Sequence, residues 1–134
     1  MDLQSFSGLP AFAIYFCVAA VLIVAYIFVY TWITPHDEFG LIRNNVPGAA
    51  LALGMSTVGF ALPLTSAIGH ANDVVDMAIW GVVALIVQII AYYLARIPLP
   101  DLSQRIAAGE LGPAIWLGCA SITAGLINAA SMSI

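Results

Sequence analysis

The sequence has little charge: only 7% of its 134 residues are charged, and three of them are basic. So few bases exclude nucleic-acid binding through a basic face, and two cysteines are too few for a disulfide-stapled secreted scaffold. Apolar residues make up 63% of the chain, and the mean hydropathy is +1.05. Because a soluble domain carries about 25% charged residues, this composition cannot cover a water-exposed surface. The sequence therefore predicts a small integral membrane protein and excludes a disordered chain.

Four stretches are long and apolar enough to cross a bilayer. A spanning helix needs about 20 mainly apolar residues, because each residue rises about 1.5 Å through a hydrocarbon layer of about 30 Å. Backbone groups in that layer must be satisfied within helices or closed barrels, and these runs lack the alternation of barrel strands. We predict an all-α membrane protein with one domain, residues 1–134, and four transmembrane helices: Pro10–Ile33, Pro47–Ile68, Met77–Ala95 and Leu111–Ile134.

The three bases predict the orientation of these helices. Arg43 lies between the first two spans, and Arg96 and Arg105 lie between the last two. Basic residues favour the cytoplasmic side, so both connecting segments are predicted there, and the N- and C-termini are predicted to be periplasmic or extracellular.

The chain resembles itself best at an offset of 64 residues, which pairs Asp37 with Asp101 and Gly54 with Gly118. Two repeat halves, about residues 10–70 and 74–134, would each contain helix, connecting segment and helix. Both halves would then have the same orientation, with a pseudo-two-fold axis along the membrane normal. The alternative is a chance match between two helices rich in alanine, glycine and leucine.

Each connecting segment also contains a candidate interfacial helix on the cytoplasmic side. Thr34 is a candidate N-cap, with Asp37 three residues later, and Leu102 and Ile106 lie four residues apart before Gly109. The alternative is an ordered polar loop in each place. His36, Asp37 and Glu38 are expected to cap a helix and to face solvent, not to bind a metal, and we expect no metal, cofactor or catalytic residue.

Small residues form a stripe on the second and fourth spans. Helices in lipid associate by close packing at such residues, either within one chain or between copies. Alanine-rich helices also supply such stripes by chance. The predicted helix-packing residues are Ala50, Gly54, Thr57, Ala61, Ala114, Gly118, Ser121 and Gly125.

Gln88 is the most polar residue deep inside a predicted span, and its amide should not face lipid. Thr57 and Ser121 are its expected partners, followed by Ser56 and Thr123, which lie at similar depth. These groups, together with Asn128, would either hold the helices together or line a narrow pathway. Pro63 is predicted to kink the second span and to free a carbonyl near Gly59.

Several segments together resemble the YjfL-like family of small bacterial inner-membrane proteins. They are Thr34-Pro35-His36-Asp37-Glu38 with Leu41-Ile42-Arg43, Gly59-Phe60-Ala61-Leu62-Pro63-Leu64, Asp76-Met77-Ala78-Ile79-Trp80-Gly81 and Gly125-Leu126-Ile127-Asn128-Ala129-Ala130. The resemblance implies a multi-pass protein of the bacterial inner membrane, built from two copies of a two-helix unit. It supplies no catalytic or ligand-binding residues.

The leading hypothesis is a non-enzymatic membrane subunit embedded in the lipid bilayer. It would form a homo-oligomer through the second and fourth spans and present its connecting segments to a cytoplasmic peripheral protein. The alternative is a small-solute channel or transporter. No charged residue lies at mid-depth in any predicted span, so the usual sign of an ion-coupled transporter is missing.

Overall fold

The computed structural model describes residues 8–34 and 38–132, and every element in this part of the chain is a helix. The four longest helices are long and apolar enough to cross a membrane, which confirms the predicted all-α membrane protein. Two short helices lie between them. The elements are α2 (Leu9–Ile33), α3 (Glu38–Arg43), α4 (Pro47–His70), α5 (Val74–Ala95), α6 (Leu102–Ala107) and α7 (Leu111–Met132).

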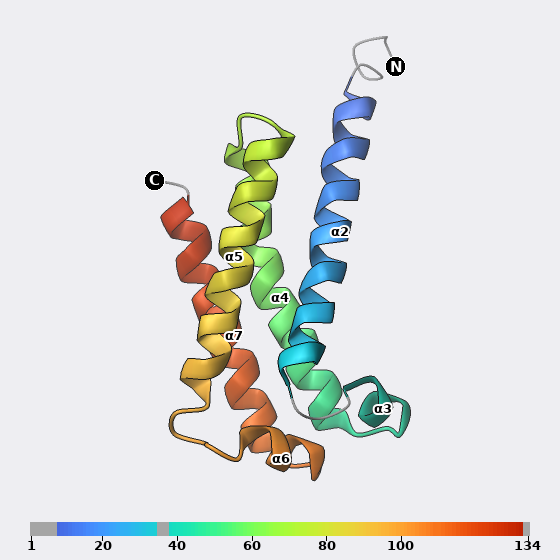
Figure 1. Cartoon of the computed structure of the whole chain (residues 1–134), viewed down its shortest axis with the longest axis vertical. Helices are drawn as coiled ribbons and strands as arrows, with labels where there is room; N and C mark the ends of the chain where they lie inside the picture. The colour runs from blue at the N-terminus through green and yellow to red at the C-terminus, as the bar shows by residue number, and fades with distance from the viewer. Residues whose placement is uncertain (1–7, 35–37, 133–134) are drawn as a thin grey trace.

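The long helices alternate in direction along the chain (Figure 1). α2 and α5 run toward the end that contains α3 and α6, and α4 and α7 run back from it. We call this end the short-helix end. α4 and α7 form the most extensive interface, α5 packs on both, and α2 packs on α4 and α5. Both segments that contain arginines therefore lie at one end, as four crossings require, while the side of the membrane that they face stays a prediction.

The two short helices end in the same backbone motif. After α3, the N–H of Val46 donates to Leu41 O and that of Asn45 donates to Ile42 O, and Asn45 has a φ of 63°. Sixty-four residues later, the N–H of Glu110 donates to Arg105 O and that of Gly109 to Ile106 O, where Gly109 has a φ of 92°. This is the Schellman termination, which needs a left-handed residue and turns the chain sharply into the next long helix.

Both short helices pack on the end of the bundle. Leu102 and Ile106 are completely buried, so the apolar face of α6 covers protein and not lipid. Beside α3, Thr34 is the C-cap of α2: its backbone N–H and its hydroxyl both bond to Tyr30 O. The predicted N-cap role of Thr34 stays a prediction, because Asp37 and the two residues before it lie outside the described residues.

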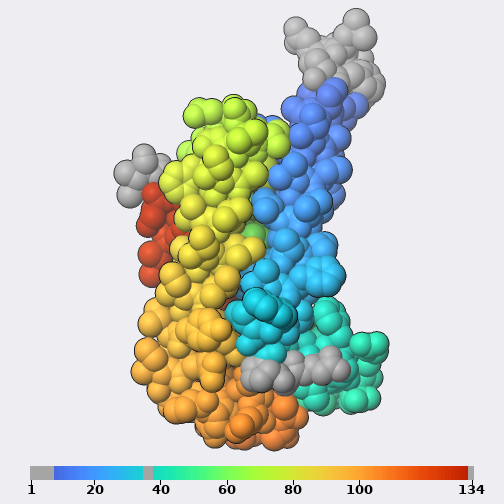
Figure 2. All heavy atoms as spheres, viewed as in Figure 1, coloured from blue at the N-terminus to red at the C-terminus, as the bar shows by residue number. Residues whose placement is uncertain are grey.

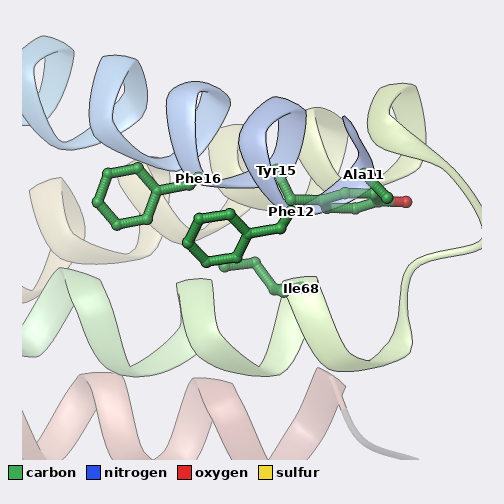
Figure 3. Close-up of a pocket in the computed structure, with 5 residues that line it drawn as sticks. All are labelled: Ala11, Phe12, Tyr15, Phe16 and Ile68. Carbon is green, nitrogen blue, oxygen red and sulfur yellow. The ribbon is translucent and has the colours of Figure 1, made fainter. Parts of the chain in front are cut away.

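α2 is the least buried of the long helices, with 6% of its most apolar window buried in the protein. Its N-terminal half stands beside the other helices (Figure 2). Phe12, Tyr15 and Phe16 of this half line a shallow cavity of ≈ 300 Å³ together with Ile68 of α4, and the ring of Phe12 lies next to Ile68 (Figure 3). The lining is almost wholly apolar, which suits contact with lipid chains or with another helix.

Candidate functional site

Gln88 joins three helices at the centre of the bundle. It is 1% exposed, and its Nε2 donates to Gly59 O of α4 and to Ser121 O of α7, each at 3.1 Å. Its Oε1 is buried without a hydrogen-bond partner among the described residues. Because Nε2 has two acceptors and Oε1 none, the amide is fixed in one orientation as a clamp between α4, α5 and α7.

Pro63 explains why Gly59 needs this donor. In a regular helix, Gly59 O would accept a bond from the N–H of residue 63, but proline has none. The amide of Gln88 supplies the replacement from a neighbouring helix. α4 continues beyond Pro63 to His70 and thus remains one helix. The predicted free carbonyl near Gly59 is therefore present, and its partner is a side chain of α5.

Close approach of α4 and α7 makes this clamp possible. A Cβ added at Gly59 would lie 2.5 Å from Ser121 O, and one added at Gly125 would lie 2.0 Å from Gly59 O. Any side chain at either position would push the helices apart. Glycine is therefore required here to bring the carbonyls of two helices within reach of one amide.

The polar part of the core continues from Gln88 toward the short-helix end. The hydroxyls of Ser56 and Ser121 lie 3.3 Å apart across the α4–α7 interface. The ring of Tyr26 of α2 stacks on Phe60 at 4.7 Å between centroids. In the other half of the bundle, the buried side chains of Leu64, Met77 and Ala84 are apolar. That half also has a hydroxyl contact between helices, because the hydroxyl of Ser66 donates to Ala129 O at 3.0 Å.

Two more polar contacts close the bundle at the short-helix end. The hydroxyl of Tyr92 lies 3.0 Å from that of Ser103, which attaches α6 to α5. The hydroxyl oxygen of Thr34 also contacts the carboxyl group of Glu38, which is 1% exposed. The expected solvated charge at Glu38 is therefore wrong, because α3 turns this side chain into the protein. His36 and Asp37 lie outside the described residues.

The solvent-exposed charge at this end is organised differently. Arg105 Nη2 lies 2.9 Å from Glu110 Oε1, and the Arg105 Nε–H donates to the same oxygen. The hydrogen bond from Arg105 lowers the pKa of Glu110, and the same bond raises the pKa of Arg105. Arg96 lies over the rings of Tyr92 and Tyr93, at 5.9 and 6.0 Å from their centroids. Neither contact forms a pocket for an anionic ligand.

The two predicted small-residue stripes differ in burial. On α7, all four residues of the stripe are buried against the rest of the chain. On α4, Ala50 and Gly54 are exposed, and Thr57 and Ala61 are only partly buried. The face of α4 that packs within the chain is another one, formed by Gly48, Ala49, Ala52, Leu53, Ser56, Gly59, Phe60, Pro63, Leu64 and Ala67.

The remaining predicted polar residues are not part of the Gln88 clamp. Thr57 donates to Leu53 O in its own helix, and Thr123 is exposed. Gln88 bonds to the backbone carbonyl of Ser121 and not to its hydroxyl. Asn128 is partly buried, and its Nδ2 has no hydrogen-bond partner among the described residues.

Sequence reasoning missed Glu38, Ser103 and the buried tyrosines Tyr26 and Tyr30. The tyrosines lie one helical turn apart on α2, so their shared face was visible in the sequence. Their position near the end of an apolar run favoured a place at the membrane surface instead. For Glu38 and Ser103 no local signal distinguishes a buried polar residue from an exposed one.

Comparison with known proteins places the fold in a family. The family model described as Domain of Unknown Function (DUF350) matches residues 4–132. The chain belongs to this family. It is also 34% identical over 126 residues to the UPF0719 inner membrane protein YjfL of Escherichia coli strain K12, which covers 94% of this chain and 96% of that protein. The protein of the same name from Escherichia coli O157:H7 matches equally well. No solved structure matches the chain. With its four apolar helices, the chain is thus a multi-pass inner-membrane protein.

Proposed function

We propose that this DUF350 protein is a non-enzymatic subunit that assembles with copies of itself in the inner membrane. In this proposal it presents α3 and α6 to a peripheral protein on the cytoplasmic side. Support comes from the way the polar groups of the core are used. Both donor bonds of Gln88 and the hydroxyls of Ser56 and Ser121 join helices to one another. Such bonds serve assembly of the bundle and leave these groups unavailable to a substrate.

The single observation that carries the proposal is the open face of α4. A Cβ added at Gly54 would meet nothing within 4 Å, whereas one added at Gly118, 64 residues later, would lie 2.7 Å from Met55 Cβ. A small residue in a membrane helix permits close approach of a second helix, and the described part of the chain supplies none at Gly54. A second copy could supply it.

A small-solute channel remains the alternative, but no observation favours it. Gln88 is 1% exposed and holds two carbonyls of the α4–α7 interface. A solute passing this point would have to break both bonds. The alternative predicts flux of small solutes through liposomes containing the protein, which the assembly proposal does not.

The substitution Gly54→Leu tests assembly. We expect it to shift the protein from oligomer to monomer in lipid nanodiscs or mild detergent, as measured by native mass spectrometry. Its helical content should not change, because a side chain at Gly54 would meet no atom of residues 8–34 or 38–132 within 4 Å. Gly69→Leu is the matched control, since Gly69 is equally open on the same helix but lies outside the stripe. A monomeric wild-type protein, or an oligomer that Gly54→Leu leaves intact, would contradict the proposal.

A further inference from the structure

The two halves of the chain have different neighbours. α5 packs on both α4 and α7, but α2 packs on α4 and α5 and has almost no contact with α7 within the described residues. If the two halves had the same surroundings, a further helix would pack on α7 in the way that α5 packs on α4. That place is open in a single chain.

A groove of ≈ 420 Å³ between α5 and α7 lies at this place. Its α7 side is formed by Cys119, Ala120, Thr123, Ala124 and Ile127. The residues 64 positions earlier are Met55, Ser56, Gly59, Phe60 and Pro63. The last four are buried in the face of α4 that includes the Gln88 contact. The α7 wall of the groove therefore corresponds to a surface that is buried within the chain on α4.

The exposed face of α2 is the counterpart of the surface that occupies α4. Cys17, Ala20, Val24 and Phe28 are all exposed. The residues 64 positions later are Gly81, Ala84, Gln88 and Tyr92, and all four are buried. Thus the face of α2 that is exposed corresponds to the face of α5 that is buried in the bundle.

The exposed stripe of α4 also differs in burial from its equivalent, the stripe of α7. Gly118 packs on Met55 inside the chain, whereas its counterpart Gly54 touches nothing. The residue 64 positions after Met55 is Cys119, which lines the groove. Gly54 thus corresponds to Gly118, and the groove at Cys119 corresponds to the surface at Met55. The two open surfaces are therefore equivalent to the two sides of the Gly118–Met55 contact.

We propose that the groove between α5 and α7 binds a second copy of this chain. This copy docks its α2 and α4 there in the way that α5 and α7 dock on α2 and α4 within one chain. The inference rests on the proposed self-assembly and specifies its interface. The groove is continuous with the established interface, because its walls are α5 and α7, which pack on each other and on α4. The contact is head-to-tail, with different surfaces on the two copies.

The contact between Ser56 and Ser121 supplies the design of a test. Their hydroxyls are 3.3 Å apart within the chain, and the corresponding pair between copies is Ala120 of one and Thr57 of the other. In a Cys17→Ala, Cys119→Ala background, Thr57→Cys is made in a copy with one tag and Ala120→Cys in a copy with another. After co-expression and mild oxidation in membranes, we expect a disulfide-linked dimer that contains both tags.

Two controls define the geometry. Each single-cysteine protein expressed alone should remain uncrosslinked. A head-to-tail contact does not bring the same residue of two copies together. Ile115→Cys in place of Ala120→Cys should give no heterodimer, since Ile115 is exposed on α7 but lies outside the groove.

The outcomes separate this inference from the proposed function. A dimer formed by Thr57→Cys with itself, or by Ala120→Cys with itself, would show a symmetric interface and overturn the head-to-tail arrangement. An oligomer by native mass spectrometry without the mixed dimer would also overturn it and leave self-assembly standing. A monomer would overturn both.

Discussion

Replacement of Gln88 by leucine should destabilise the bundle by about 2 kcal/mol. The change removes two bonds from Nε2, one to α4 and one to α7. Hydrogen bonds between membrane helices are worth about 0.6 kcal/mol each on average, so their loss accounts for about 1.2 kcal/mol. The loss also leaves Gly59 O buried without a donor, which costs about 1 kcal/mol or more. Removal of the unpaired Oε1 offsets a small part of this sum.

Most of this cost should depend on Pro63. The substitution Pro63→Ala returns an N–H to α4 that can donate to Gly59 O, four residues earlier. In that background Gln88 is no longer the required donor for this carbonyl. We therefore expect Gln88→Leu to cost about 1 kcal/mol less in the Pro63→Ala protein, which is about a fivefold difference in the unfolding equilibrium.

Reversible unfolding in mixed detergent micelles of increasing SDS content measures these free energies through the fluorescence of the three tryptophans. Ile86→Leu serves as the control, because Ile86 is exposed on the same helix and should have no effect. If the effects of Gln88→Leu and Pro63→Ala add to within about 0.3 kcal/mol, the amide does not replace the missing backbone donor. The account of the clamp is then wrong.

Two further predictions use other parts of the chain. Gly125→Ala should lower the free energy of unfolding by about 2 kcal/mol or more in the same assay, because its Cβ would lie 2.0 Å from Gly59 O. Gly54→Ala meets nothing within 4 Å and should change it by less than about 0.5 kcal/mol in monomeric micelles; equal effects would refute the assigned contact. In a cysteine-free background, Arg43→Cys and Arg105→Cys should both resist a membrane-impermeant maleimide added to spheroplasts, while Asp73→Cys is labelled. Labelling of only one of the two arginine positions would contradict the common side of α3 and α6.

The four spans could be predicted because the bilayer itself sets their length and composition. The predicted Pro47–Ile68 corresponds to α4 at Pro47–His70, and the predicted Met77–Ala95 to α5 at Val74–Ala95. The differences lie at helix ends, where the sequence changes gradually from apolar to polar. Asp73, for example, lies four residues before the predicted start at Met77, and it caps α5 by accepting from Asp76 N.

The partners of Gln88 could be predicted only in part. Depth in the membrane singled out Gln88 as a residue that needs a partner, and the proline rule pointed to a free carbonyl near Gly59. Nothing in either local pattern says that the two groups meet, because that depends on the packing of α5 against α4. The sequence pointed to side-chain hydroxyls, whereas two glycines bring the backbone close enough to serve instead.

The unequal burial of the two stripes has a physical cause that composition does not reveal. In a chain of like units, each unit buries one surface against the preceding unit and another against the following one, so the first and last units each keep one surface open. Here α7 buries Gly118 on α4, and no described segment of the chain covers Gly54. Likewise, α4 accepts Gln88 of α5, and no described segment fills the groove beside Thr123. If the 64-residue offset reflects two like units, the open face at Gly54 and the open groove beside Thr123 are the surfaces that the proposed head-to-tail contact would join.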